Sequence, residues 1–304
     1  MNVKLFTITT MAILLSTTVI ACEPPAKEPQ NVPPPLDEWW KQIESGGEMY
    51  SDFRYKEADG AITIIRYEGE GGTVSIPPEI EGMPVTAIGI HAFRDTELTD
   101  VVIPDSVTSI GNSAFRKNQL TSVTIGNRVV SIGDMAFGGN QLASVVIPNS
   151  VTSIGAFAFR GNRLTNVVIP DSVTSIGNWA FDGNLLTDIT IPDSITRIAP
   201  GTFHLNKLTS VVIPGSVTLI GGGAFSNNPL TFVNIPASVT KIESNAFHGI
   251  SLTGITIGEN VDIHENEFGD AFGHSFFVKQ YNAGGRQAGT YTRPDINSTV
   301  WVKQ

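Results

Sequence analysis

The sequence contains a single cysteine among its 304 residues, and this scarcity excludes several ways of stabilising a fold. One thiol, that of Cys22, cannot form a disulfide within the chain or a metal site built from several cysteines. Apolar residues make up 41% of the chain, which is enough for a core and too many for a disordered protein. Stability is therefore expected to come from side-chain packing.

Positive charge is also scarce. The 19 lysine and arginine residues are outnumbered by 29 aspartate and glutamate residues, which gives a formal net charge of -10. Proteins that bind a nucleic-acid backbone need clustered lysine and arginine. The sequence has no such cluster along the chain, so nucleic acid is not expected as a partner.

Motifs for catalysis are lacking as well, although a catalytic site needs several unlike groups brought together. The stretch that begins with His264 and Glu265 has Phe268 where a zinc protease needs its second histidine. The stretch that begins at Gly273 lacks the second glycine of a nucleophile elbow. We therefore expect a protein without enzymatic activity, cofactor or metal.

The N-terminal stretch that ends at Cys22 has the pattern of an export signal. Lys4 is followed by an apolar and hydroxyl run from Leu5 to Ile20, about the length of a signal-peptide core. The run ends in V-I-A-C at Cys22, which resembles the bacterial lipobox. That resemblance implies cleavage before Cys22 and attachment of a lipid to its thiol. An ordinary signal peptide with a chance cysteine and an uncleaved anchor are the alternatives.

A proline-rich stretch follows the cysteine. Residues 23–35 contain six prolines in thirteen positions, and this composition favours an extended polyproline II tether. We therefore expect residues 1–21 to be a signal peptide, and residues 22–50 to hold the lipidated cysteine and a tether to a membrane surface.

The rest of the chain is dominated by a repeat, first seen as VVIPDSVTSIGNSAFRKNQLTS. A longer unit near Val74 precedes the regular ones, so the array has about nine units. The period of about 22 residues, with the pattern Leu-x-x-Val-x-Ile, is typical of a leucine-rich repeat solenoid. The regular units begin at Val101, Val123, Val145, Val167, Ile189, Val211, Val233 and Ile255.

Within one unit, Val167 and Ile169 alternate with exposed residues and are expected to point inward from a strand that Pro170 ends. Stacked strands predict one parallel sheet on the concave face of a right-handed superhelix. The return side is expected to hold turns, with Ala180 and Phe181 on a short helical turn.

Two columns of identical residues are expected inside the array. Each phenylalanine ring buries roughly 150 to 250 Å², and each asparagine amide can satisfy backbone groups at a bend; a row of ligand-binding amides is the alternative for the asparagines. The phenylalanine column includes Phe115, Phe137, Phe159, Phe181, Phe203 and Phe225. The asparagine column is Asn118, Asn140, Asn162, Asn184, Asn206 and Asn228.

Both ends of such an array need a cover, because terminal coils expose apolar surface and strand edges. Residues 51–73 are expected to form an N-terminal β cap, with a hairpin over residues 53–67 that turns at Asp59 and Gly60. The array then covers residues 74–268. Residues 269–304 are expected to form a C-terminal β cap, with a short meander over residues 276–302.

The repeat unit I-P-D-S-V-T-S-I-G-x-x-A-F-x-x-N-x-L-T-x-V-x-I closely resembles the BspA-type repeat of bacterial surface proteins over roughly residues 71 to 268. The resemblance implies a lipid-anchored protein on the outer surface of a cell envelope, acting as an adhesin or surface antigen. The implied partner is another protein or cell surface, such as a host extracellular matrix protein, bound by a monomer. An envelope-internal scaffold or a glycan-binding lipoprotein is the alternative.

Two surfaces are candidates for partner binding. The exposed strand face carries a row that includes Val146, Val168 and Val212, with Phe232 beside it, although valine suits any strand. A second column, just before the Ala-Phe pair, places large apolar side chains on three consecutive coils about 5 Å apart; partial burial is the alternative for these. They are Met135, Phe157 and Trp179.

Overall fold

The computed structural model describes residues 46–263 and 276–304. The predicted export signal, the lipidation of Cys22 and most of the tether lie outside the described residues, as do the motif at His264 and the start of the one at Gly273. The first described strand, β1 (Glu48–Tyr50), lies just before residue 51, where the N-terminal cap was predicted to begin.

The described chain begins with an antiparallel hairpin. Strands β2 (Phe53–Ala58) and β3 (Ala61–Tyr67) pair with each other, and β1 pairs with β2. Asp59 and Gly60 have φ angles of 52° and 71°, so both central residues of the turn are left-handed, as a tight hairpin with this twist requires. Strand β3 also pairs in parallel with β6 (Met83–Ile88), which joins the hairpin to the first coil.

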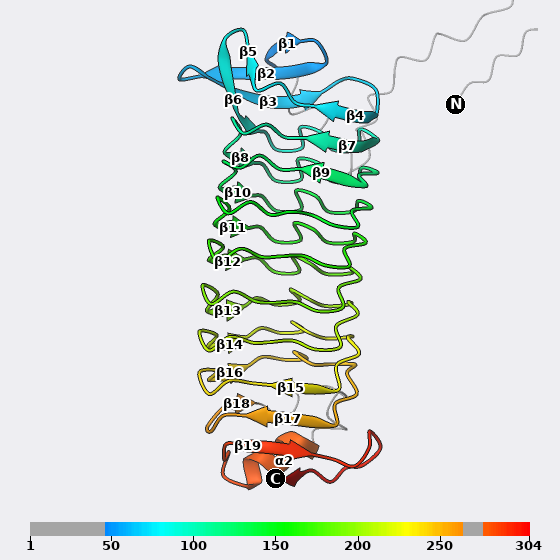
Figure 1. Cartoon of the computed structure of the whole chain (residues 1–304), viewed down its shortest axis with the longest axis vertical. Helices are drawn as coiled ribbons and strands as arrows, with labels where there is room; N and C mark the ends of the chain where they lie inside the picture. The colour runs from blue at the N-terminus through cyan, green and yellow to red at the C-terminus, as the bar shows by residue number, and fades with distance from the viewer. Residues whose placement is uncertain (1–45, 264–275) are drawn as a thin grey trace, which may run out of the picture. The chain divides into compact units, whose positions relative to one another are not determined.

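The repeats stack as a solenoid with parallel strands, which confirms the predicted fold class (Figure 1). Each coil contributes to two ladders rather than to one sheet. The first ladder is the predicted Val-x-Ile strand, which in the central coils is reduced to isolated bridges such as Val146 to Val168. Its strands are β4 (Gly72–Ser75), β7 (Leu98–Val102), β9 (Ser122–Thr124), β15 (Phe232–Asn234) and β17 (Gly254–Ile257).

The second ladder runs along a two-residue segment that ends in isoleucine, with the sequence Ser-Ile in four of the coils, where the sequence predicted no strand. Two residues are too few to show the alternation that predicts a strand. Its short strands are β8 (Ser109–Ile110), β10 (Ser131–Ile132), β11 (Ser153–Ile154), β12 (Ser175–Ile176), β13 (Arg197–Ile198), β14 (Leu219–Ile220), β16 (Lys241–Ile242) and β18 (Asp262–Ile263). The strands pair in the order β6-β8-β10-β11-β12 and, further along, β13-β14-β16-β18. Strand β5 (Glu79–Ile80) pairs with β6 at the start of the ladder.

The return segment forms turns, and among residues 46–263 no helix is found. Around Phe181 the backbone makes one local turn bond, from the Asp182 amide to the Trp179 carbonyl at 3.2 Å, while the Phe181 amide donates to the Thr202 carbonyl of the next coil at 3.0 Å. Trp179, two residues earlier, has a φ of 58°, and a left-handed residue cannot continue a right-handed helix.

The C-terminal segment differs from the predicted β meander. Its described part starts with a helix, α2 (Phe276–Ala283), followed by β19 (Gly289–Thr292) and β20 (Val302–Lys303). Phe277 and Tyr281 lie four residues apart, on one face of the helix, and both are fully buried. Strand β19 pairs antiparallel with β17 and so covers the edge of the first ladder.

A phenylalanine column runs through the interior of the array. Neighbouring rings from Phe93 to Phe247 lie 4.9 to 5.9 Å apart between centroids, and all are buried. Beside it, the Asn162 side chain accepts from the Leu142 amide at 3.1 Å and donates to the Phe137 and Phe159 carbonyls. Each such asparagine therefore ties its own coil to the preceding one, and the core holds the surface side chains at a fixed spacing.

Candidate binding surface

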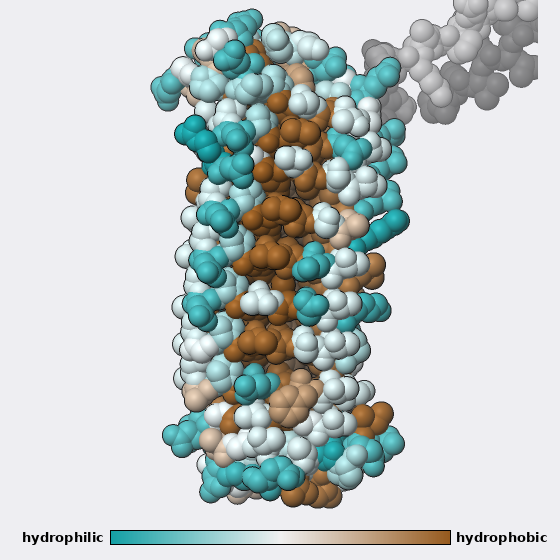
Figure 2. Space-filling view, viewed as in Figure 1, coloured by the Kyte–Doolittle hydropathy of each residue, from teal (hydrophilic) through white to brown (hydrophobic). Residues whose placement is uncertain are grey.

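The outward side of the first ladder carries a row of exposed valines. The exposed fraction of Val146 is 81%, that of Val168 is 72% and that of Val212 is 69%. We call these three residues the valine strip. Figure 2 shows a hydrophobic band running along this face of the solenoid. Apolar side chains exposed this fully on a rigid surface are typical of sites that bind a partner.

Phe232 lies in the row next to the valine strip and is 45% exposed. Its ring lies over the following coil at Gly254, where an added Cβ would be only 2.5 Å from a ring carbon. The glycine therefore makes room for the ring, which lies against the next coil beside the valine strip. A side chain that already packs against its neighbour loses less conformational entropy when a partner binds than a free side chain does.

Met135, Phe157 and Trp179 form a second apolar group on the return segment, which we call the aromatic column. Their φ angles are 56°, 57° and 58°, in the left-handed region. The same position holds Gly201 and Gly223 in later coils. His91, Ser113 and Asn245 hold the same conformation at this position in other coils, so the repeat backbone requires it. A side chain with a Cβ costs about 1 to 2 kcal/mol in this conformation.

The side chains of the aromatic column are half-buried, so they are partly covered and partly accessible. The rings of Phe157 and Trp179 are parallel, with centroids 6.5 Å apart. The indole of Trp179 covers Gly201, where a side chain would collide with it. His204 meets the indole edge-on at 5.1 Å. Packing within the return segment thus fixes the rings without removing them from the surface.

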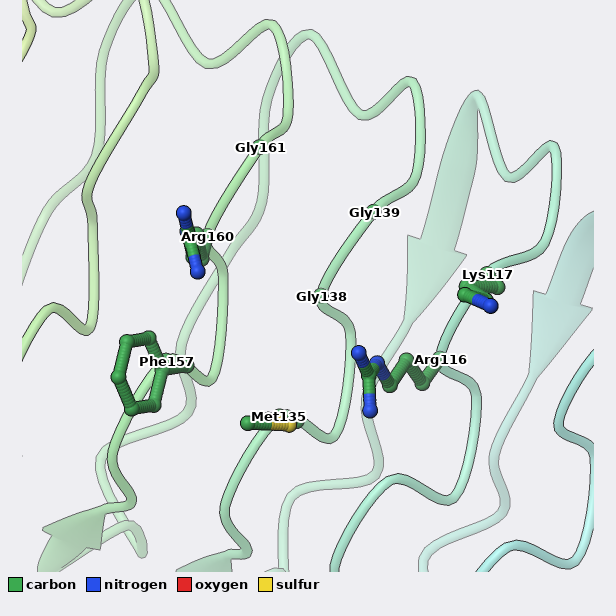
Figure 3. Close-up of a pocket in the computed structure, with 8 residues that line it drawn as sticks. All are labelled: Arg116, Lys117, Met135, Gly138, Gly139, Phe157, Arg160 and Gly161. Atoms are coloured by element: carbon green, nitrogen blue, oxygen red, sulfur yellow. The ribbon is translucent and has the colours of Figure 1, made fainter. Parts of the chain in front are cut away.

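A hollow of about 250 Å³ lies at the N-terminal end of the aromatic column, between Met135 and Phe157 (Figure 3). Three cationic side chains surround it, and we call it the Arg116–Arg160 hollow. The Arg160 guanidinium lies 5.5 Å from the centre of the Phe157 ring. The lining residues are Arg116, Lys117, Met135, Gly138, Gly139, Phe157, Arg160 and Gly161.

Ionisable side chains next to this hollow form a short network. The Arg160 side chain contacts the buried carboxylate of Asp182 at 2.8 Å, and Asp182 also contacts the His204 ring at 2.7 Å. Burial lowers the pKa of Arg116, and the positive charge of Arg94 lowers it further. The charged form of Arg116 is therefore less stabilised than that of an arginine in water.

These cations were missed from the sequence, where they are spread along the chain. The signal was nevertheless present, since Arg94, Arg116 and Arg160 each follow the phenylalanine of their repeat. Stacking turns equivalent positions of successive repeats into neighbours, so a cluster that is absent along the chain exists on the folded surface.

A second hollow of about 320 Å³ lies beyond Trp179, lined among others by His204 and His248. Among the residues that the structure describes, no group of three histidine, cysteine, aspartate or glutamate side chains could hold a metal ion. Within the same part of the chain, no helix has the length and apolar character needed to cross a membrane.

Solved structures similar to this chain are leucine-rich repeat proteins of bacteria. A protein from Bacteroides ovatus is 25% identical, with a TM-score of 0.53, over 70% of this chain and 68% of that one. A protein from T. pallidum is 25% identical, with a TM-score of 0.49, over 59% of this chain and 90% of that one. A search among curated proteins found no match.

A family model described as the BspA type leucine rich repeat region matches six copies, at residues 86–204, 130–253 and 197–271. Together these matches cover more than half of the 304 residues. They include both the valine strip and the aromatic column. The chain therefore belongs to the BspA type leucine-rich repeat family.

Proposed function

We propose that this protein is exported, anchored by a lipid on Cys22 and exposed on the cell surface, where it binds another protein as an adhesin or surface antigen. The observation that carries the binding part of this proposal is the valine strip. Three side chains of the same shape, each more than two-thirds exposed, stand on consecutive or nearby coils of a rigid ladder.

The geometry of the strip favours a protein partner over a small molecule. Adjacent coils of a parallel ladder are about 4.8 Å apart, so the row from Val146 to Val212 spans about 14 Å of the outer face, with Thr190 between Val168 and Val212. Small ligands are usually held in concave pockets, whereas extended solenoid faces bind other macromolecules. Because the ladder is already ordered, binding would cost little conformational entropy.

The export and anchoring part of the proposal is supported by the sequence. The apolar run from Leu5 to Ile20, the V-I-A-C motif and the proline-rich stretch follow one another in the order that a tethered lipoprotein requires. A Cys22→Ala variant is expected to lose incorporation of labelled palmitate, while a Cys22→Ser variant serves as a second test of the same thiol.

Protease treatment of intact cells tests surface exposure. We expect the full chain to be cut while a marker protein from inside the envelope stays intact. Complete protection of the chain on intact cells, with cleavage after the cells are opened, would contradict surface exposure. That result would support the alternative, an envelope-internal scaffold or glycan-binding lipoprotein.

A further inference from the structure

We propose that the Arg116–Arg160 hollow recognises an acidic peptide segment of a partner protein, with a carboxylate between the two arginines and an adjoining apolar side chain on Met135 and Phe157. This inference rests on the proposed function, because it assumes that the partner is a protein. It adds the chemistry of the ligand and a second contact site, separate from the valine strip.

The hollow exists because one coil lacks a side chain. The position after the core phenylalanine is Arg116 in one coil, Gly138 in the next and Arg160 in the third. With coils about 4.8 Å apart, the two arginines start roughly 10 Å from each other. Gly138 leaves the space between them open, and that space can accept a carboxylate contacted from both sides.

The charge of the lining matches a carboxylate. Among the described residues, three cationic side chains and no acidic one line the hollow, in a chain whose net charge is -10. Asp182 contacts Nε of Arg160 at 2.8 Å and so orients the guanidinium, whose terminal nitrogens carry the other N–H donors. Arginine binds carboxylates through such paired donors.

A bound anion would also stabilise the charged form of Arg116. Burial and then the positive charge of Arg94 destabilise its charged form and lower the pKa of its guanidinium, while the negative charge of Asp95 offsets part of this effect. A bound carboxylate would offset both effects. The carboxylates of the neighbouring coils balance the positive charge of the hollow only in part. A carboxylate of the ligand would balance the rest.

The apolar part of the ligand is indicated by Met135 and Phe157. Both side chains are half-buried and both hold the left-handed backbone conformation that glycine or asparagine adopts at lower cost. Methionine is flexible and adapts to apolar groups of different shape. An acidic residue followed or preceded by an apolar one would satisfy both parts of the hollow.

A long polyanion fits this surface less well than a short acidic segment. The column that holds Arg116 and Arg160 continues with Asp182, His204 and Ser226, so its positive charge ends within one coil of the hollow. Nucleic acids and sulfated polymers need cations along a continuous track. The structure provides a track only a few coils long.

Selection from a random peptide library on the purified full chain tests the proposal. The library is first depleted on a Gly138→Leu variant, which fills the hollow without changing its charge. The equivalent position carries an arginine in both neighbouring coils, and a Cβ at Gly138 would lie 3.3 Å from the Phe157 carbonyl oxygen, so a small local shift accommodates the leucine. We expect the enriched peptides to contain aspartate or glutamate next to an apolar residue.

An enriched peptide is then synthesised and its affinity is measured for three proteins: the wild-type chain and two variants. Arg116→Gln is expected to weaken binding about tenfold to hundredfold, the loss typical of one charged hydrogen-bonded contact. Arg128→Gln removes the same charge from an exposed turn elsewhere and should leave the affinity unchanged. Replacing the acidic residues of the peptide by their amides should weaken binding at least about tenfold.

Any of four results would overturn the proposal. The first three are no enriched peptide, enriched peptides without acidic residues, and equal affinity for the wild-type chain and Arg116→Gln. The fourth is tighter binding of a sulfated oligosaccharide in competition, which would favour a polyanion. If Gly138→Leu fails to fold, Arg116→Gln decides alone. Because these assays use purified protein, a loss of surface exposure in the protease experiment would defeat the proposed function without affecting them.

Discussion

Phe181 stands in the middle of the phenylalanine column, with ring centroids of its neighbours at 5.5 and 5.9 Å. Its side chain is fully buried. Phe181→Ala is therefore expected to lower the free energy of unfolding by about 3 to 5 kcal/mol, because it leaves a cavity between two coils. Denaturant unfolding followed by circular dichroism measures the loss. An unchanged unfolding curve would show that the column is not the core of the array.

Met135 lies on the same coil as the core residue Phe137 but plays a different part. Met135→Gly removes about 1 to 2 kcal/mol of left-handed strain and loses the packing of a half-buried side chain, worth about 1 kcal/mol. The two effects nearly cancel, so the free energy of unfolding should change by less than about 1 kcal/mol.

Denaturant unfolding of Met135→Gly, compared with that of Phe181→Ala, distinguishes a structural role of Met135 from a role in binding. A loss close to that of Phe181→Ala would mean that Met135 is held for packing. A change of less than about 1 kcal/mol in the free energy of unfolding would mean that the fold does not need the methionine side chain. That result is expected if the side chain contacts a partner.

Residue identities were easier to predict than backbone conformation. The period of the repeat aligns the phenylalanines and asparagines without reference to any structure. The left-handed conformation at Trp179 was not foreseen, since a large side chain is uncommon there. The signal lay in the same column in the next two coils, where Gly201 and Gly223 stand, residues that adopt this conformation at no steric cost.

At the scale of elements, the N-terminal hairpin contains a buried phenol with a raised pKa. Tyr55 in β2 is 1% exposed, and its hydroxyl donates to Glu48 at 3.1 Å. Burial, followed by the hydrogen bond and negative charge of Glu48, raises its pKa to about 12. The unfolded value is about 10, so the folded state favours the neutral phenol.

This shift predicts how stability depends on pH. The contribution of Tyr55 is complete below pH of about 10 and is lost as pH rises from about 10 to about 12. Tyr55→Phe should lose less stability across that window than the wild-type chain does. Denaturant unfolding at several alkaline pH values measures the difference, and parallel pH curves for the two proteins would contradict the assigned shift.

Strands could be predicted from the sequence only where the alternation of residues was long enough to recognise. The hairpin of β2 and β3 has alternating residues and a turn at Asp59 and Gly60, and it forms where predicted. The short strands of the second ladder are two residues long and form because they pair with the coils above and below them. No local pattern could have indicated them.

At the scale of the whole molecule, stacking creates surfaces that have no counterpart along the chain. Residues one or two repeats apart become neighbours, so Val146 and Val168 form one apolar row and Arg116 and Arg160 line one hollow. The valine row could be read from the repeat because it lies on a predicted strand. The hollow depends on the missing side chain of Gly138, and it emerged only from the folded arrangement.

The valine strip is the proposed main contact for the partner. Replacing Val146, Val168 and Val212 together by asparagine should abolish this contact while preserving the fold, because Asn234 already occupies the same row. A matched control replaces the exposed Thr152, Thr174 and Thr218 by asparagine in the same three coils. Thermal unfolding of both variants checks that each is folded.

The most direct measurement compares the protein partners that are photo-crosslinked on intact cells by the wild-type chain, the valine variant and the threonine control. We expect the same crosslinked partner for the wild-type chain and the control, and at least about a tenfold lower yield for the valine variant, because its interface loses the apolar centre. Equal yields from all three folded proteins would contradict binding of a partner at the valine strip.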